Sequence, residues 1–458
     1  MLKHLKKHQL NMLEGPLLPG IIRYTVPIIL TSVLQLLFNA ADLIVVGKFC
    51  GSISVGAVGA TTSLTNLLVN LFIGLSVGAG VSVAHGIGSR DEEQVRSAVH
   101  TAVPLAIICG VFLTVVGLTL SKPLLVLMNT PENTLPLSAV YMRIYFCGIT
   151  FTVLYNFCAA ILRAAGDTRS PLIYLTFAGV INVILNLFFV TVFHMNVAGV
   201  ALATVISQAI AAILVTRALM HRNDACKLEP GKVRIQKQQL LKILQIGLPA
   251  GIQSSLFGIS NVTIQSSINS FGDAFVAGNA AAVNLEGFLY VTLNSFQQTA
   301  VNFVGQNVGA RQYRRANKTV WICQSCVAVL GIAMGTALWG FGEQLLGIYI
   351  NDSPEAISYG LIRFVYVSLP YFMLGLLDVS TGALRGYGQS LAPMIISVLG
   401  ICGIRVAWVC TLFQIPAFHT PQWLYISYPV SWFVTLAVQT FFFLHIRKKF
   451  WNSDITIK

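Results

Sequence analysis

Long apolar stretches alternate with short polar segments along almost the whole chain. Twelve of the apolar stretches are long enough to cross about 30 Å of hydrocarbon as helices. Their predicted ranges are 21–46, 55–85, 97–120, 135–162, 171–193, 197–219, 240–269, 275–307, 319–341, 357–384, 391–414 and 424–446. The pattern therefore predicts an all-α, multi-pass integral membrane protein with twelve transmembrane helices.

The composition agrees with this interpretation. Of the 458 residues, 55% are hydrophobic and only 10% are charged, whereas soluble domains carry about 25% charged residues. The basic N-terminal segment has no short apolar core followed by a small-residue cleavage site, so we do not expect a removable signal peptide. Cys323 and Cys326 have CxxC spacing but lie in an apolar run, which favours packing over a redox or zinc site.

The net charge of +13 reflects the topology. Of the 29 Lys and Arg residues, 24 lie in the two terminal segments and in every second loop between the predicted helices. The positive-inside rule then places these loops and both termini in the cytoplasm. The basic balance predicts contact with lipid headgroups and does not indicate nucleic-acid binding.

The two halves of the chain repeat each other. The longest polar link, RALMHRNDACKLEPGKVRIQKQQLLK, separates helices 1–6 from helices 7–12. Motifs at four separated places match at an offset of 221 or 222 residues, which indicates an internal duplication. The matched positions are Pro27 and Pro249, Gly56 and Gly278, Arg90 and Arg311, Arg163 and Arg385, Gly166 and Gly388, and Pro171 and Pro393. Because each half has an even number of helices, the repeats are predicted to be parallel.

These repeats predict a division of the chain into two lobes joined by a cytoplasmic linker. The predicted parts are a cytoplasmic tail at 1–20, an N-lobe at 21–220, a linker at 221–239, a C-lobe at 240–446 and a second cytoplasmic tail at 447–458. A stripe of small residues on the second helix, spaced four apart, is expected to pack closely against another helix. Its members are Gly74, Gly78, Ser82 and Gly86.

The paired LRxxG…P loops, the segment VGQNVGAR and the helix-6 run GVALATVISQ resemble the bacterial branch of the multidrug and toxic compound extrusion (MATE) transporters. The resemblance covers roughly residues 15 to 450. It implies a V-shaped pair of lobes around a central cavity. It also implies a secondary active exporter of organic, often cationic, compounds that uses Na⁺ or H⁺ entry by alternating access.

The motifs that are missing from the sequence bear on the energy source. No GxxxxGK[ST] or HExxH pattern occurs, so we expect neither ATP hydrolysis nor zinc-dependent peptide hydrolysis. We expect a transporter and not an enzyme, with no cofactor and with Na⁺ or H⁺ as the coupling ion. The alternatives are a flippase for lipid-linked oligosaccharides from the same superfamily and a non-transport integral membrane protein. The expected setting is a monomer in the cell membrane that binds small organic compounds.

Charged side chains within a span are costly and are functional candidates by default. Asp42 lies in the apolar run LQLLFNAADLIVVG, roughly 28 Å along helix 1 from Arg23. We predict that this carboxylate takes up Na⁺ or H⁺; the alternative is an interfacial Asp that pairs with Lys48. The family resemblance supports the first interpretation, because the bacterial N-lobe site has an Asp at this spacing from a helix-1 Pro, here Pro27, where helix 1 is expected to bend.

The resemblance also implies partners for Asp42. The family's helix-5 Asn matches Asn182, but the second helix-5 Asp of the family is replaced by Asn186. The helix-6 Thr matches Thr204, and Asn156 on helix 4 is a further candidate. Asn182 and Asn186 share a helix face, so one carboxylate among neutral oxygens remains able to bind a hard cation or a proton. The alternative role of the asparagines is hydrogen bonding between helices.

The predicted C-lobe carries three buried charges, Glu286, Asp378 and Arg405. An arginine in the middle of a span needs a carboxylate partner, and we expect Asp378, or failing that Glu286, to pair with Arg405. Such a pair would be structural, and a role in coupling or substrate binding is the alternative. Asp378 shares a helix face with the family's helix-10 Asp position, here near Leu374, but does not match it.

Overall fold

The computed structural model describes residues 9–128, 130–350 and 353–455 of the chain. Helices and their connections make up this described part, which contains no β-strand. The chain divides into two compact units. Unit 1 comprises residues 1–11 and 26–255, and unit 2 comprises residues 12–25 and 256–458. The boundaries fall inside helices α1 and α8, so the first turns of α1 belong to unit 2 and the first half of α8 belongs to unit 1.

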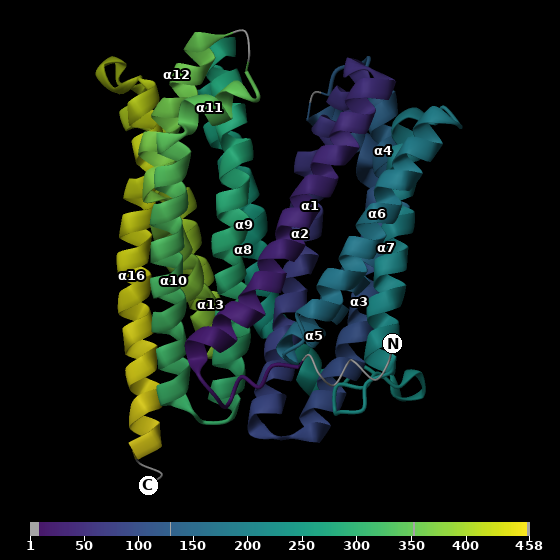
Figure 1. Cartoon of the computed structure of the whole chain (residues 1–458), viewed down its shortest axis with the longest axis vertical. Helices are drawn as coiled ribbons and strands as arrows, with labels where there is room; N and C mark the ends of the chain where they lie inside the picture. Colours follow the sequence, from purple (N-terminus) through teal and green to yellow (C-terminus); the bar gives the residue numbers. More distant parts are fainter. Residues whose placement is uncertain (1–8, 129, 351–352, 456–458) are drawn as a thin grey trace. The chain divides into compact units, whose positions relative to one another are not determined.

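Unit 1 contains most of the first eight α-helices. Their bounds are α1 Leu17–Cys50, α2 Ser52–Ser89, α3 Glu92–Leu127, α4 Leu135–Cys147, α5 Ile149–Ala164, α6 Arg169–Thr191, α7 Asn196–Met220 and α8 Lys237–Asn269, with a 3₁₀ turn, η2, at Pro230–Lys232. Helix α5 packs against α2, α3 and α7, and α6 packs along α7 (Figure 1). The apolar core of the unit fills the space around α5 and is made mostly of Ala, Val, Leu and Phe side chains.

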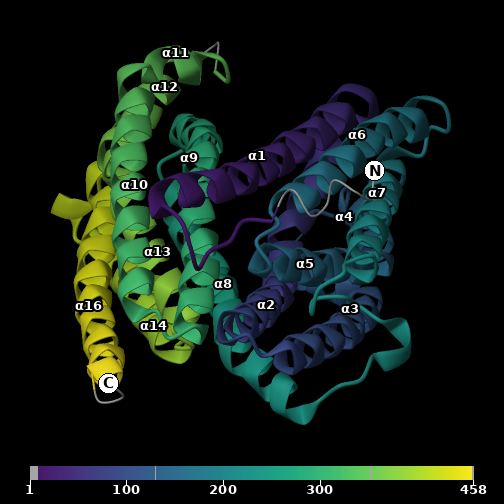
Figure 2. The same cartoon turned by 60° about the horizontal axis from the view of Figure 1, so that its bottom comes forward.

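Unit 2 contains the remaining helices and several irregular turns. The α-helices are α9 Asp273–Gly309, α10 Tyr313–Gly340, α11 Gly342–Gly347, α12 Pro354–Arg363, α13 Phe372–Gly386, α14 Leu391–Ser397, α15 Ile404–Cys410 and α16 Pro421–Ile455. The turns are π-helical at η3 Phe364–Ser368 and η5 Val398–Gly403, and 3₁₀ at η4 Leu369–Tyr371, η6 Leu412–Gln414 and η7 Pro416–Phe418. Helices α10 and α13 both pack against α9, and α16 packs against α13 (Figure 2).

The predicted spans are confirmed. Eleven helical segments are long and apolar enough to cross a membrane, and the pair α4–α5 supplies a twelfth span if it is counted as one. This pair is bent by 47° at Gly148. A Cβ atom at Gly148 would overlap the side chain of Val205 on α7, so the bend is packed closely against the neighbouring helix.

The internal duplication is visible in the backbone of each half. Three residues with left-handed φ in the first half have counterparts 221 or 222 positions later, namely Gly51 and Gly272, Arg90 and Arg311, and Gly166 and Gly388. The turns at Gly166 and Gly388 also share their hydrogen bonds. Asp167 N donates to Leu162 O at 2.9 Å, and Gln389 N donates to Leu384 O at 2.8 Å. Both loops therefore end their helix with the same glycine turn.

The small-residue stripe on α2 packs closely, as predicted. Within unit 1, a Cβ on Gly74 would overlap backbone atoms of Gly251, and a Cβ on Gly78 would overlap the backbone near Gly247. The contact runs antiparallel, since the residue numbers rise along α2 while they fall along α8. Four glycines thus let the backbones of α2 and α8 approach to a distance that no larger residue allows.

Irregular turns interrupt the tenth and eleventh spans. Pro370 lies in η4 and has no N–H for the helical ladder, which accounts for the break after the π turn η3. The second π turn, η5, lies directly before Arg405. Because each residue advances an α-helix by about 100°, an extra residue in a turn changes the face on which all later side chains lie.

Candidate functional site

Asp42 accepts a hydrogen bond from the side-chain amide of Asn186 in unit 1. Asp42 lies on α1 and is partly buried, whereas Asn186 lies on α6 and is completely buried. Helix α1 brings the carboxylate into an apolar stretch, because most of its neighbours along the helix are Leu, Val, Ala and Phe. The amide of Asn186 and the hydroxyl of Thr204 on α7 are therefore the described polar groups that interact with this carboxylate.

The hydrogen bonds continue from Asn186 to a second helix. Asn186 Nδ2 also contacts Asn182 Oδ1 at 3.3 Å, and Asn182 Nδ2 donates to Thr204 Oγ1 on α7 at 3.4 Å. The Thr204 hydroxyl donates to the carbonyl of Val200 at 3.0 Å. The spacing of four residues places both asparagines on one face of α6, and this face carries the polar chain from Asp42 to α7.

One acceptor among these hydrogen-bonded side chains is unpaired. Asn186 Oδ1 is buried and has no hydrogen-bond partner among the described residues. A buried acceptor without a partner is costly, and this one belongs to the amide that contacts Asp42. One carboxylate and one free amide oxygen are suited to a monovalent cation, because a hard cation takes oxygen ligands and a single positive charge neutralises Asp42.

A proton suits the same groups. Amide oxygen and nitrogen are assigned from the hydrogen-bond network, so a protonated Asp42 could donate to Asn186 Oδ1 after rotation of the amide. In both cases the bound charge is +1 and the site becomes neutral. A divalent cation would instead leave an excess positive charge among apolar neighbours, which is unfavourable.

Two further residues differ from the predicted set. Asn156 does not join the chain, because its amide donates to the carbonyl of Thr152 on its own helix α5 at 2.8 Å. Tyr141 on α4 was not a candidate, yet it lies close enough to Asp42 to interact electrostatically. Its ring stacks on that of Tyr145 at 6.4 Å. A tyrosine in an apolar helix gives no sequence signal that distinguishes this role from packing.

Pro27 lies within the continuous helix α1. The carbonyl of Pro27 accepts a hydrogen bond from Thr31 Oγ1 at 2.7 Å. Within α1, the change from unit 2 to unit 1 falls at Val26, one residue before Pro27. The missing N–H of the proline weakens the helical ladder at this point, and the predicted bend of helix 1 stays a prediction.

The second group of buried charges lies in unit 2, around Glu286 on α9. Arg363 at the end of α12 contacts both carboxylate oxygens, with Nε at 3.1 Å from each and Nη2 at 2.7 Å from Oε2. Arg363 Nη1 donates to Asn279 Oδ1 at 2.8 Å, and Ser368 Oγ donates to Glu286 Oε1 at 2.8 Å. The result is a hydrogen-bonded buried ion pair.

The predicted pairing of Arg405 is wrong. Glu286 pairs instead with Arg363, a residue that was not among the predicted site residues. Asp378 accepts instead from Asn294 at 3.5 Å. Arg405 donates through Nε to Ser431 at 3.0 Å, and its guanidinium lies 4.0 Å from the centre of the Tyr428 ring. The π turn directly before Arg405 changes the face on which it lies.

Asp378 on α13 belongs to a second polar group of unit 2. Asn294 Nδ2, which contacts Asp378, also donates to Gln297 Oε1 at 2.9 Å. Tyr290 and Arg385 lie within electrostatic range of the carboxylate. Asp378 is only 8% exposed. The amide of Asn294 on α9 and the positive charge of Arg385 stabilise its negative charge.

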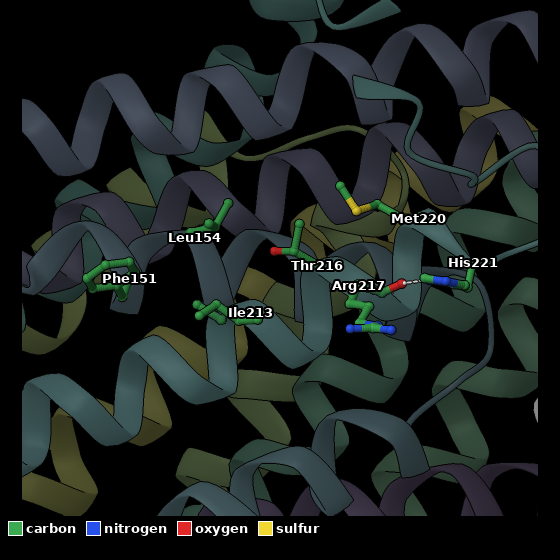
Figure 3. Close-up of a pocket in the computed structure, with 8 residues that line it drawn as sticks. Phe151, Leu154, Ile213, Thr216, Arg217, Met220 and His221 are labelled. Atoms are coloured by element: carbon green, nitrogen blue, oxygen red, sulfur yellow. Dashed lines mark hydrogen bonds between the residues drawn. The ribbon is translucent and has the colours of Figure 1, made fainter. Parts of the chain in front are cut away.

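A groove of about 470 Å³ lies between α5 and α7 in unit 1 (Figure 3). Its lining residues are Phe151, Leu154, Ala212, Ile213, Thr216, Arg217, Met220 and His221. Figure 3 shows Phe151 at one end and Arg217 with His221 at the other, where His221 Nδ1 lies 2.8 Å from the carbonyl of Arg217. None of the predicted site residues lines this groove.

The repeated halves, the twelve spans and the dispersed intramembrane charges define an α-helical membrane transporter built from two homologous six-span repeats. The family comparison identifies it further. The MatE family model matches residues 27–188 and 249–409, and the chain belongs to this family. The match confirms the resemblance seen in the sequence, and members of this family are secondary transporters and not enzymes.

Similar proteins include bacterial multidrug resistance proteins. The chain is 29% identical over 397 residues to the probable multidrug resistance protein YpnP of Bacillus subtilis, which covers 86% of this chain and 87% of that protein. It is 22% identical over 409 residues to the multidrug export protein MepA of Staphylococcus saprophyticus, covering 88% of this chain and 90% of that one.

Solved structures share the fold. An outward-facing multidrug resistance MATE family transporter of the MOP superfamily superposes with a TM-score of 0.90 at 19% identity, covering 97% of this chain and 99% of that chain. A mutant of the Vibrio cholerae MATE transporter VcmN gives 0.87 at 19% identity, covering 94% of this chain and 97% of that one. At these identities the likeness supports the fold.

Proposed function

We propose that this chain is a secondary active multidrug efflux transporter that exports organic compounds in exchange for Na⁺ or H⁺, and that Asp42 binds the coupling ion. The observation that carries the proposal is the unpaired oxygen of Asn186 beside a carboxylate within a membrane span. The relatives named as multidrug resistance and multidrug export proteins support the substrate class.

The charge of the site sets the expected stoichiometry. Asp42 is its only carboxylate among the described residues, since the second position of the polar face is Asn186. One monovalent cation makes the site neutral, and a second would restore a buried charge. We therefore propose that unit 1 takes up one Na⁺ or one H⁺ in each transport cycle, with drug and ion favouring different conformations.

We also propose that the protein acts as a monomer in the cell membrane with both termini in the cytoplasm. The distribution of Lys and Arg supports this orientation, because 24 of 29 lie in the terminal segments and in alternate loops. Labelling of cysteines introduced one at a time at the exposed positions Ser89 and Gln312 tests it, in a background where the exposed Cys147 and Cys410 are replaced by serine. Reagents that do not cross the membrane should label both positions in permeabilised cells and neither in intact cells.

The coupling role is tested by export from proteoliposomes under separate Na⁺ and pH gradients. The Asp42→Asn variant keeps the shape of the side chain and removes its charge. We expect it to lose the ion-driven part of export, because the neutral site no longer gains from binding a cation. Asp273→Asn, at the exposed first turn of α9, is the matched control and should keep wild-type export.

Two results would overturn the assignment. Full-rate export by Asp42→Asn with unchanged ion dependence would remove Asp42 from the coupling mechanism. Export by the wild type that responds to neither gradient would remove ion coupling altogether. Substituting Asn186 by Leu tests the free amide oxygen, and we expect a weaker dependence on the ion at unchanged protein yield.

A further inference from the structure

The buried charges of unit 2 do not cancel around Tyr428. Arg363 lies 5.3 Å and Arg405 4.0 Å from the centre of this ring, and Glu286 engages Arg363 alone. In the described part of the chain, no carboxylate lies within ion-pair distance of Arg405, which is only 5% exposed. Around Tyr428, the two arginines and the single glutamate leave one excess positive charge.

The terminal amino groups of Arg405 are available. Arg405 uses Nε to donate to Ser431, and its guanidinium plane lies against the rings of Tyr428 and Trp432, 5.4 Å from the latter. These contacts fix the side chain but leave its terminal amino groups without a hydrogen-bond acceptor among the described residues. Paired N–H groups of this kind match the two oxygens of a carboxylate or phosphate.

A further buried donor beside Arg405 is unpaired. Trp432 Nε1 is buried without a hydrogen-bond partner among the residues that the structure describes. The Trp432 ring lies 5.4 Å from the guanidinium of Arg405. Buried donors are normally satisfied, so a surplus of donors at one place indicates a missing acceptor.

Aromatic faces surround the same position. The ring of Tyr371 meets that of Trp432 edge-on at 5.3 Å, and Tyr428 meets Trp432 edge-on at 5.8 Å. Such rings offer large apolar contacts to a flat molecule at a low entropic cost. The π turn η5, a feature common at functional sites, ends directly before the helical turn that carries Arg405.

We propose that Arg405 and Trp432 bind the anionic group, a carboxylate or phosphate, of an aromatic substrate. The guanidinium neutralises the anion, Trp432 Nε1–H donates to it, and the rings of Tyr371 and Tyr428 contact the flat part of the molecule. The inference rests on the proposed efflux function and specifies one substrate class for it: zwitterionic or anionic aromatic compounds. Alternating access supplies the route by which a solute reaches this buried position.

A matched pair of probes tests the role of the anion. Norfloxacin carries a carboxylate, and its methyl ester has the same ring system without that charge. Export of both is measured in phosphatidylcholine proteoliposomes. We expect Arg405→Gln to weaken the apparent affinity for norfloxacin about tenfold, as for the loss of one charge-assisted contact, and to leave the ester within about twofold of wild type.

Two further variants separate recognition from folding. Arg405→Lys keeps the charge and should recover part of the affinity for norfloxacin, whereas Trp432→Phe keeps a ring, removes the N–H and should weaken norfloxacin binding selectively. Arg143→Gln, an exposed position in unit 1, is the control. Equal losses for acid and ester in Arg405→Gln would overturn the proposal, and so would unchanged norfloxacin export.

A last arm distinguishes a solute from a lipid headgroup, which carries the same anionic oxygens. Norfloxacin binding to the purified protein is followed by tryptophan fluorescence, with and without phosphatidylglycerol. The occupant is a lipid, and the proposal fails, under two conditions together: phosphatidylglycerol changes the fluorescence of the wild type but not of Arg405→Gln, and both proteins bind norfloxacin equally well. If the wild type exports neither probe, the proposed efflux function fails, whereas export of both probes that is indifferent to Arg405 refutes this inference alone.

Discussion

Neutralising Glu286 should destabilise unit 2 more than neutralising Arg363. The carboxylate of Glu286 accepts three contacts from Arg363 and one from Ser368. Among the described residues it is the only carboxylate within ion-pair distance of Arg363, and Arg405 has none. Glu286→Gln leaves both Arg363 and Arg405 buried without a counter-charge. Arg363→Met leaves one buried anion, Glu286, and one buried cation, Arg405.

The magnitude follows from the geometry. Breaking a buried ion pair by removing one partner costs about 3–5 kcal/mol. Both guanidinium groups lie on the ring of Tyr428, so they are no more than about 9 Å apart. At an effective dielectric constant of about 20, two such charges repel by about 2 kcal/mol. This repulsion is present in the wild type and remains in Glu286→Gln, whereas Arg363→Met removes it and is therefore less costly by about this amount.

The assay is reversible unfolding of the purified protein in mixed micelles of a mild detergent and SDS, followed by tryptophan fluorescence. We expect Glu286→Gln to lower the free energy of unfolding by at least about 3 kcal/mol, and Arg363→Met to lower it by about 2 kcal/mol less. Two outcomes would refute the counting of charges around Tyr428. One is that Arg363→Met lowers the free energy of unfolding more than Glu286→Gln does. The other is that Glu286→Gln costs under about 1 kcal/mol, well below the range for a broken buried pair.

Two other predictions concern single residues of unit 1. Gly251→Leu should cost several kcal/mol or prevent folding, since any Cβ overlaps the Leu71 carbonyl. The control is Gly258→Ala, further along the same helix in unit 2, where the space is open, and it should change stability by less than about 1 kcal/mol in the same unfolding assay. Burial opposes ionisation of Asp224, but hydrogen bonds and the charge of Arg222 hold its pKa below the usual 3.8. The folded-state pKa is the lower one, so the stabilisation is present above about pH 4 and is lost as the pH falls through the folded-state pKa. The difference in stability between wild type and Asp224→Asn should therefore persist at pH 7 and shrink as the pH falls below about 4. We expect it to be under about 1 kcal/mol, because the Asp224 side chain is 42% exposed.

The spans could be predicted because their length and apolar content follow directly from the thickness of a bilayer. The predicted and observed ends differ by a few residues, as at α1, predicted at 21–46 and observed at Leu17–Cys50. The break at Gly148 could not be predicted, because the apolar pattern continues through it. The repeat was predictable from matched motifs, and the left-handed residues Gly166 and Gly388 show that it extends to single backbone angles.

The site was partly predictable. Matching to a family placed Asp42, Asn182 and Thr204 in one set, and the structure connects them through Asn186. The unpaired oxygen of Asn186 depends on which way an amide is turned, and no sequence pattern encodes that. Helical spacing failed in unit 2, because the π turn before Arg405 changes the face that later residues occupy.

The duplication tests whether these charges are needed for the fold. The position that corresponds to Arg405 is Val183, and those that correspond to Glu286 and Arg363 are Leu64 and Tyr141. The first half builds the same six spans with neutral residues at these places, so the fold itself does not require the charges. The double variant Glu286→Leu with Arg363→Tyr, which copies the first half, should therefore be more stable than Glu286→Gln alone, as for buried ion pairs replaced by apolar groups. A double variant that unfolds at lower SDS than Glu286→Gln would mean that the pair is structural in unit 2 and that the halves have diverged in their packing as well as in their charges.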